Sequence, residues 1–324
     1  MPNYTLSVVI RKAIIYLVII GFLMIIPWSC PSYITGLVTV ALISAICAMS
    51  YDLLMGYTGL VSFGHTFGWG IGAYTVGILV GKGITTDFWV VAGVAILAAA
   101  AVGAIFALVA FRTHGIYFSL ITLALAQLLH ALTLKWSTVT GGENGLTGIS
   151  RPWSLEDLSF YYFTAACFLI LFALMRQLVN SWFGRILVGI RENESRMITL
   201  GYNTWVFKYA IFVISGILAS FAGLLSGYYR GIASPEDFYF MSTGHFLLMV
   251  LIGGRGTLIG PILGSFFVVF ASNYLSAYTD EWMMILGIMF VLVVMFARKG
   301  IGGYLQEWKG WIAFQFSRRL SSRA

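Results

Sequence analysis

Residues 88–111 read FWVVAGVAILAAAAVGAIFALVAF, an apolar run without a charged side chain. At about 1.5 Å of rise per residue, a helix of this length crosses the roughly 30 Å hydrocarbon core of a bilayer. The strands of a transmembrane barrel are only about 10 residues long and alternate between apolar and polar residues, which this run does not do. The run therefore predicts a membrane-spanning helix.

The rest of the chain has the same character. Of its 324 residues 60% are hydrophobic and 10% are charged, whereas a water-soluble domain carries about 25% charged residues. Because backbone N–H and C=O groups need internal partners in hydrocarbon, we predict an all-α, multi-spanning transmembrane bundle of eight to ten helices. The candidate spans are residues 11–28, 34–54, 57–81, 88–111, 116–134, 160–178, 206–229, 243–254, 257–277 and 282–298.

Two of these spans are irregular. Residues 56–74, GYTGLVSFGHTFGWGIGAY, are too rich in glycine to form one smooth helix. Residues 243–254 are too few to cross a bilayer and end at Gly253 and Gly254. Some helices of the bundle are therefore predicted to be broken.

Basic residues gather on one side of the predicted topology. The side that carries residues 176–208 and the tail after 298 holds 15 of the 19 Lys and Arg residues and 4 of the 12 acids. By the positive-inside rule this side is cytoplasmic, and ten crossings place both termini there. The net charge of +7 is explained by this topology and by contact of the tail with anionic lipid. We therefore predict membrane lipid as a partner and no nucleic-acid partner.

We predict one membrane domain, residues 1–303, followed by a basic amphipathic cytoplasmic tail, residues 304–324. Residues 135–159 form a long outer, periplasmic loop, and residues 179–205 form a long inner loop. Within the inner loop, residues 184–200 predict a helix that ends at a left-handed glycine, Gly201. Such an amphipathic helix either lies on the membrane surface or docks onto a cytoplasmic partner.

The inner loop also carries a family resemblance. Residues 184–203, GRILVGIRENESRMITLGYN, resemble the cytoplasmic loop of the permease subunits of branched-chain amino-acid ABC transporters, a family that includes urea and short-amide permeases. Further stretches that resemble the same family, in the same order, are MGYTGLVSFGHTFGWGIGAY (55–74), GIYFSLITLALAQLL (115–129) with TGGENGLTGI (140–149), and LIGGRGTLIGPILGSF (251–266).

The resemblance implies a bacterial inner-membrane permease that imports branched-chain amino acids or similar small solutes. Its implied partners are a second homologous permease, two cytoplasmic ATP-binding subunits, a periplasmic substrate-binding protein and the small-molecule substrate. The inner loop would be the coupling helix that contacts the ATPase. The residues expected to take part are Gly184, Arg185, Ile190, Arg191, Glu192, Asn193, Glu194, Arg196 and Gly201.

Broken helices expose backbone polar groups to a zwitterionic or amide substrate, so the two irregular segments supply candidates for the translocation pathway. These candidates are Thr58, Gly59, Ser62, Gly64, His65, Gly68 and His245. Close helix packing is the alternative for the glycines, and a hydrogen bond between helices is the alternative for the histidines. Asp52, an acid within an apolar run, is either functional or lies at the interface beside a basic residue.

The outer loop contains a glycine-rich polar turn that would face the binding protein, unless it is only a connector. The residues concerned are Gly141, Gly142, Glu143, Asn144 and Gly145.

Several functions are disfavoured by missing motifs. The chain has no GxxxxGK[ST], HExxH or GxSxG motif and no Cys/His cluster, so we predict neither an enzyme nor a cofactor or metal site. A self-sufficient secondary transporter or channel remains the alternative function, although the scarcity of acids within the spans disfavours it.

Overall fold

The computed structural model describes residues 21, 24–28 and 31–296. Most of the predicted first span, 11–28, lies outside the described residues, as do the end of the last span and the predicted tail, 304–324.

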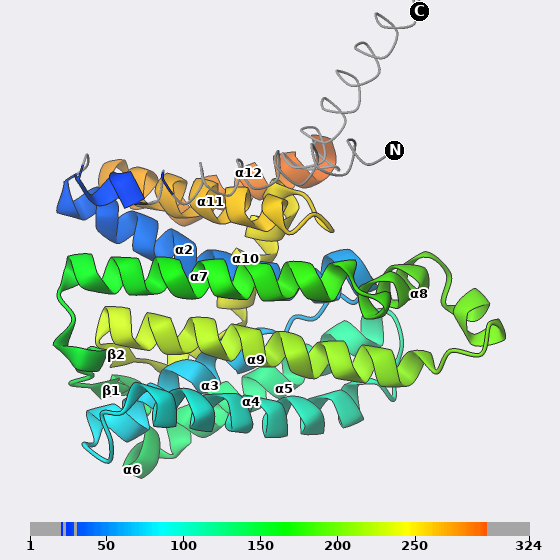
Figure 1. The fold of residues 1–324 in the computed structure, drawn as a ribbon, viewed down its shortest axis with the longest axis horizontal. Helices are drawn as coiled ribbons and strands as arrows, with labels where there is room; N and C mark the ends of the chain where they lie inside the picture. The colour runs from blue at the N-terminus through cyan, green and yellow to red at the C-terminus, as the bar shows by residue number, and fades with distance from the viewer. Residues whose placement is uncertain (1–20, 22–23, 29–30, 297–324) are drawn as a thin grey trace, which may run out of the picture.

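Over the described residues the chain forms a helical bundle, as predicted (Figure 1). Six helices are long and apolar enough to cross a membrane, and three shorter ones are also apolar. Together these nine helices of the described residues lie within the predicted range of eight to ten. The long helices are α2 (Ser32–Asp52), which continues as a π-helical turn (Leu53–Thr58), α4 (Phe88–Ala110), α5 (Ile116–Lys135), α7 (Asp157–Asn180), α9 (Thr204–Arg230) and α11 (Ile259–Tyr278). The shorter ones are α3 (Thr66–Val76), which continues as a π-helical turn (Gly77–Gly81), α10 (Phe240–Gly253) and α12 (Trp282–Phe296).

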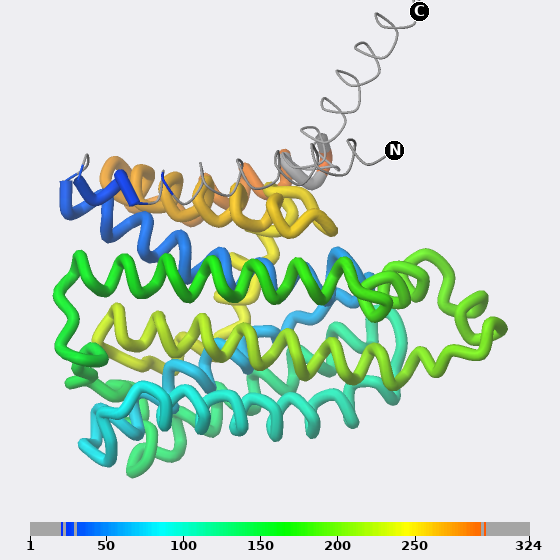
Figure 2. Tube along the Cα trace, in the orientation of Figure 1, coloured from blue at the N-terminus to red at the C-terminus, as the bar shows by residue number. Residues whose placement is uncertain are grey.

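The remaining elements lie at the two ends of the bundle. The amphipathic helix α8 (Trp182–Thr199) extends past the ends of α7 and α9 at one end (Figures 1 and 2). The opposite end carries α6 (Ser137–Thr140) and a two-stranded antiparallel sheet in which β1 (Leu146–Thr147) pairs with β2 (Ile232–Ala233) (Figure 1). The described part of the chain also contains three 3₁₀ turns, at Gly142–Asn144, Pro152–Ser154 and Pro235–Phe238. The two long loops predicted from the sequence therefore lie at opposite ends.

The broken helices are confirmed. The chain leaves the π-helical turn after α2 at Gly59, which has a φ of +80°, and becomes helical again only at Thr66. α10 ends at Gly253, and Gly254 follows with a φ of +104°. Both α3 and α10 are thus too short to span a bilayer alone.

The centre of the bundle is a close contact between α3 and α9. A Cβ atom at Gly72 would lie 1.9 Å from the Ser220 carbonyl oxygen, and one at Gly223 would lie 1.9 Å from the Trp69 carbonyl oxygen. Only glycine allows the two backbones to approach this closely, which is how small residues hold helices together in lipid. The glycines of the sequence thus build the core that carries the broken helices.

The rim of the bundle is apolar and exposed. Large side chains such as Leu97 (71% exposed) and Ile105 (60%) project from α4, most of whose apolar surface is not covered by the rest of the bundle. In water this surface would be unfavourable, whereas lipid solvates it.

Candidate functional site

α8 is anchored to the bundle by one face. Ser181 caps its first turn, because the hydroxyl accepts a hydrogen bond from the Gly184 N–H at 3.4 Å. Ile186, Leu187 and Ile190 are buried. After the helix, Gly201 has a φ of +88°, as predicted for the residue that ends it.

The structure divides α8 at Asn193, a feature that was not predicted. Asn193 has extended backbone angles (φ −159°, ψ 98°), and its Oδ1 accepts a hydrogen bond from the Arg196 N–H at 3.0 Å. Asn193 therefore caps a second short helical segment, a role for which asparagine is among the preferred residues. That preference was the signal in the sequence that would have located the kink.

Glu194 connects this second segment to the start of α9. Its Oε1 accepts hydrogen bonds from Lys208 Nζ at 2.5 Å and from Thr204 Oγ1 at 2.9 Å. Burial raises the pKa of the carboxyl, but these bonds and the charges of Lys208 and His114 outweigh burial, so the pKa of Glu194 lies below its ordinary value. Glu194 is thus ionised at neutral pH and paired within the chain.

Arg191 connects the first segment of α8 to the end of α2. Its Nη1 donates to the Gly56 carbonyl oxygen in the π-helical turn. Gly56 lies directly against Asp52, because a Cβ atom at Gly56 would be 2.0 Å from Asp52 Oδ1 and 2.3 Å from the Gly256 N–H nitrogen. No larger residue fits at this position.

Asp52 in turn holds the loop between α10 and α11. The side chain is fully buried, so it does not extend to the membrane surface. Its carboxylate accepts from the Gly256 N–H at 2.7 Å and from the Leu258 N–H at 3.4 Å. We call the group Asp52, Gly56, Arg191, Gly256 and Leu258 the Asp52 junction. It joins α8, α2 and the α10–α11 loop.

The opposite face of α8 is open. Two large apolar side chains beyond the kink, Ile198 and Leu200, are 57% and 64% exposed. Exposed polar residues accompany them, namely Arg185, Glu192, Asn193 and Arg196. Among the described residues, the side chains of Arg185 and Glu192 have no hydrogen-bond or ion-pair partner.

The predicted pathway residues fall into two groups. Thr58 and Gly59 line a cavity of about 720 Å³ between the π-helical turn, α5, α8 and α9. Four others are packed between helices and do not line this cavity or the two others whose lining is described: Ser62, Gly64, His65 and Gly68. His65 shares a hydrogen bond of 2.8 Å with Ser50 Oγ, which matches the helix-to-helix alternative.

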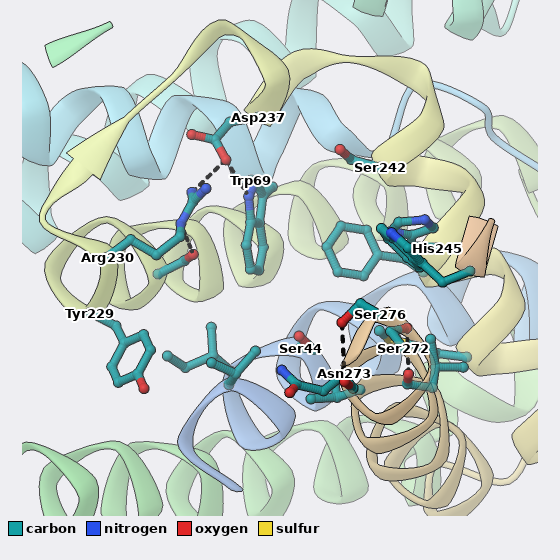
Figure 3. Close-up of a pocket in the computed structure, with 18 residues that line it drawn as sticks. Ser44, Trp69, Tyr229, Arg230, Asp237, Ser242, His245, Ser272, Asn273 and Ser276 are labelled. Carbon is teal, nitrogen blue, oxygen red and sulfur yellow. Dashed lines mark hydrogen bonds and ion pairs between the residues drawn. The ribbon is translucent and has the colours of Figure 1, made fainter. Parts of the chain in front are cut away.

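His245, the remaining pathway candidate, lines a cavity of about 420 Å³ beside α10 (Figure 3). Residues from α2, α3, α9, α10, α11 and α12 surround this space, which we call the α10 cavity. Its most strongly charged feature is the ion pair between Arg230 Nη2 and Asp237 Oδ1, at 2.5 Å. Trp69 Nε1 donates to the same carboxylate oxygen at 3.1 Å.

Sequence reasoning missed most of the polar lining of the α10 cavity. Of the residues that line it, only His245 is among the pathway residues predicted from the sequence, whereas Arg230, Ser44 and Asn273 are not. The available signal was the pair formed by Arg230, at the end of an apolar helix, and Asp237, in a Ser-Pro-Glu-Asp turn. Opposite charges this close in sequence at a helix end suggest a structured ion pair.

The glycine-rich outer turn packs against β2 and leaves two side chains exposed. Gly145 approaches β2 so closely that a Cβ atom would lie 2.3 Å from the Ala233 carbonyl oxygen, and Gly141 has a φ of +79°. Gly142 is buried, whereas Glu143 and Asn144 are exposed. The turn therefore presents these two polar side chains at the end of the bundle opposite α8 (Figure 1).

Nothing in the described ranges suggests a metal centre, because no three His, Cys, Asp or Glu side chains gather there.

Comparison with known proteins supplies the family. No solved structure matches the chain. The LivM permease of the high-affinity branched-chain amino acid transport system of Escherichia coli is 27% identical over 291 residues, which cover 81% of this chain and 68% of LivM. LivH of Salmonella typhimurium is 27% identical, over 82% of this chain and 93% of LivH. A probable LivM of Methanocaldococcus jannaschii is 25% identical, over 76% of this chain and 82% of that relative.

The family described as branched-chain amino acid transport system / permease component matches residues 33–294, nearly all of the described chain. These relatives are transport subunits and not enzymes. The chain is therefore a multi-pass membrane protein that belongs to the branched-chain amino acid permease family.

Proposed function

We propose that this chain is one of two permease subunits of an ATP-driven importer in the bacterial inner membrane. It would move branched-chain amino acids or similar small solutes from the periplasm to the cytoplasm. The two kinds of permease among its relatives, LivM and LivH, support a second homologous permease as partner. In this proposal two cytoplasmic ATPase subunits supply the energy and a periplasmic binding protein delivers the substrate.

The observation that carries the proposal is the two-sided character of α8. One face is tied to the bundle through Ile190 and the Asp52 junction. The other presents exposed apolar and charged side chains, among them Glu192 and Leu200, which have no partner in the described chain. Apolar anchors with charged side chains around them are typical of a docking surface.

The orientation follows from the same assignment. With α8 on the ATPase side, both termini are cytoplasmic, and the turn at 141–145 faces the periplasm and the binding protein. The charge asymmetry of the sequence supports this orientation. ATP-driven closure of the ATPases would move α8, and the Asp52 junction would pass that motion to α2 and to the α10–α11 loop.

Glu192→Ala tests the proposal against a helix that only lies on lipid. At a protein interface, removal of one member of a charge pair costs about 2–5 kcal/mol, so the purified permease should lose its ATPase partner. On an anionic membrane surface, loss of a negative charge would instead improve contact. The measurement is the amount of ATPase retained by the affinity-purified complex, with ATP-dependent uptake of L-leucine into proteoliposomes as the second readout.

Asp87→Ala, an exposed acid at the other end of the bundle, is the matched control and should leave both readouts unchanged. If Glu192→Ala inserts normally, retains the ATPase and transports at the parental rate, the docking assignment of this residue is wrong. Uptake without any ATPase in the liposomes would instead support a self-sufficient transporter.

A further inference from the structure

We propose that the α10 cavity binds a zwitterionic aliphatic amino acid, with the carboxylate of the ligand at Arg230 and its side chain against the apolar walls. The inference rests on the proposed function and adds to it a site and an orientation for the substrate.

The first argument is the state of Arg230. Its Nε donates to Ser226 Oγ at 3.0 Å and its Nη2 to Asp237, which leaves Nη1 without a partner among the described residues. The side chain is 37% exposed and borders the cavity. A guanidinium fixed on one side and free on the other is suited to a carboxylate, because its N–H groups match the two oxygens.

Asp237 acts on the ligand through Arg230. The carboxylate is only 4% exposed and already accepts hydrogen bonds from Arg230, Trp69 and the Ser234 N–H. It therefore has little capacity left for an ammonium group. Its role is to orient Arg230 and to neutralise the site, so that a ligand without net charge is preferred over an anion.

The first turn of α10 lies on the same side of the cavity as Arg230 and Asp237 (Figure 3). Ser242, in this turn, borders the cavity and donates to the Glu236 carbonyl oxygen at 3.1 Å, which holds the turn against the segment that carries Asp237. The start of a helix carries partial positive charge. It therefore adds to Arg230 in favouring the carboxylate at this side.

The opposite side offers the Ser44 hydroxyl for the ammonium, beside Asn273, whose Oδ1 already accepts a hydrogen bond from the Tyr33 hydroxyl. Figure 3 shows Ser44 and Asn273 across the space from Arg230 and Trp69. Ser44 is 7% exposed, borders the cavity, and its hydroxyl has no hydrogen-bond partner among the described residues. Because this hydroxyl borders the cavity, its oxygen is available to accept a hydrogen bond from a ligand ammonium.

Much of the remaining wall is apolar, although Tyr229, His245, Ser272 and Ser276 also line it. The apolar part is supplied by Val40, Ile43, Val268, Val269, Met249, Phe246 and Trp282. The volume of about 420 Å³ is within the usual range for small-molecule sites, roughly 300–1,000 Å³. Charged amino-acid side chains would lack a partner here, so the lining selects aliphatic ones.

The test is protection of a cysteine in the cavity. In a parent in which the native cysteines are replaced, Val40→Cys and Val269→Cys, at two apolar wall positions of the cavity, are made in the full complex and treated with a small thiol reagent. Millimolar L-leucine should slow labelling of both several-fold, whereas leucinol, which lacks the carboxylate, and urea should not. Gly93→Cys, at an open position on α4, is the control whose labelling should not respond.

A second pair of variants tests the orientation. Arg230→Gln alone leaves Asp237 buried without its charge partner and can fail to fold, so it is compared with Arg230→Gln/Asp237→Asn, which keeps the site neutral. In the double variant the L-leucine concentration needed for half-maximal protection of Val40→Cys should rise about tenfold and become equal to that of leucinol, since a charge-assisted hydrogen bond is lost.

Equal protection by L-leucine and leucinol in the parent, protection by urea, or no protection while the same complex still transports L-leucine with ATP would each overturn the site. The last result would leave the proposed function intact. Loss of ATP-dependent transport in the unmodified complex would instead contradict the function, whatever the labelling shows.

Discussion

Arg191, in the middle of α8, donates a hydrogen bond to the backbone carbonyl of Gly56, which lies 135 residues earlier in the chain. Asp52, one turn before Gly56, accepts hydrogen bonds from the loop that precedes α11. An exposed helix is thereby connected through one guanidinium and one buried carboxylate to two segments of the bundle core.

We predict that Arg191→Ala uncouples ATP hydrolysis from transport. The variant loses the contact between α8 and Gly56 but keeps the buried anchors of α8, so the ATPase should still bind. We expect transport per ATP hydrolysed to fall about tenfold, in line with the loss of a charged hydrogen bond, which contributes about 1.5–3 kcal/mol. The measurement is uptake and ATP hydrolysis in the same proteoliposomes.

Arg191→Lys keeps the charge and should restore part of the transport per ATP hydrolysed. Arg112→Ala removes an exposed arginine in another loop and should leave this ratio unchanged. An unchanged ratio in Arg191→Ala would show that α8 moves the bundle by another route.

The second prediction concerns glycine packing. Gly72→Ala would place a methyl group 1.9 Å from the Ser220 carbonyl oxygen, and backbone cannot shift cheaply. We expect a loss of about 1–3 kcal/mol in stability, the usual cost of overpacking. Gly93→Ala, where nothing lies within 4 Å, should be neutral or stabilising, since alanine favours a helix by about 1 kcal/mol over glycine. Thermal aggregation in detergent measures the stability of both variants. Similar Tm values for Gly72→Ala and Gly93→Ala would contradict the α3–α9 contact.

The helix spans and breaks can be predicted from the sequence, whereas the contacts between distant segments cannot. Hydropathy locates most spans because lipid requires long apolar helices, and the glycines of 56–74 indicate a break because glycine weakens a helix. The contact of Asp52 with Gly256 joins segments 204 residues apart, and no local pattern records such a contact. The α10 cavity is likewise assembled from six helices, each of which contributes one or a few polar side chains.

A third prediction concerns pH. Because the pKa of Glu194 is lower in the folded chain than its ordinary value of 4.5, its pairing with Lys208 stabilises the fold above that value. The contribution is lost as the pH falls through the lower, folded pKa. Glu194→Gln should therefore speed amide exchange in residues 194–204 at pH 7 up to about fivefold, as for partly exposed pairs of about 0.2–1 kcal/mol.

The difference in amide-exchange rate between parent and Glu194→Gln should shrink when exchange is measured at a pH below 4.5, the ordinary pKa of the glutamate carboxyl. A difference that stays constant with pH would mean that the amide disturbs packing and not charge.

The fourth prediction is topological. Asn144 and Ser195 are both exposed, at opposite ends of the bundle. In cells with a permeabilised outer wall, an impermeant thiol reagent should label Asn144→Cys but label Ser195→Cys only after the membrane is opened. Labelling of both from outside, or of Ser195→Cys alone, would reverse or refute the proposed orientation.

The last prediction concerns the turn that carries Glu143 and Asn144. Gly145 packs closely against the backbone at Ala233, and this contact restrains the turn that presents the two exposed side chains. If this turn receives the binding protein, Glu143→Ala/Asn144→Ala should reduce the stimulation of ATP hydrolysis by the loaded binding protein, chiefly by raising the concentration needed for half-maximal stimulation. Basal hydrolysis should not change, because the turn lies far from α8, at the other end of the bundle (Figure 1). Ser150→Ala, an exposed residue later in the same loop, is the control. Stimulation curves that superimpose for parent and double variant would show that the turn is only a connector between α5 and α7.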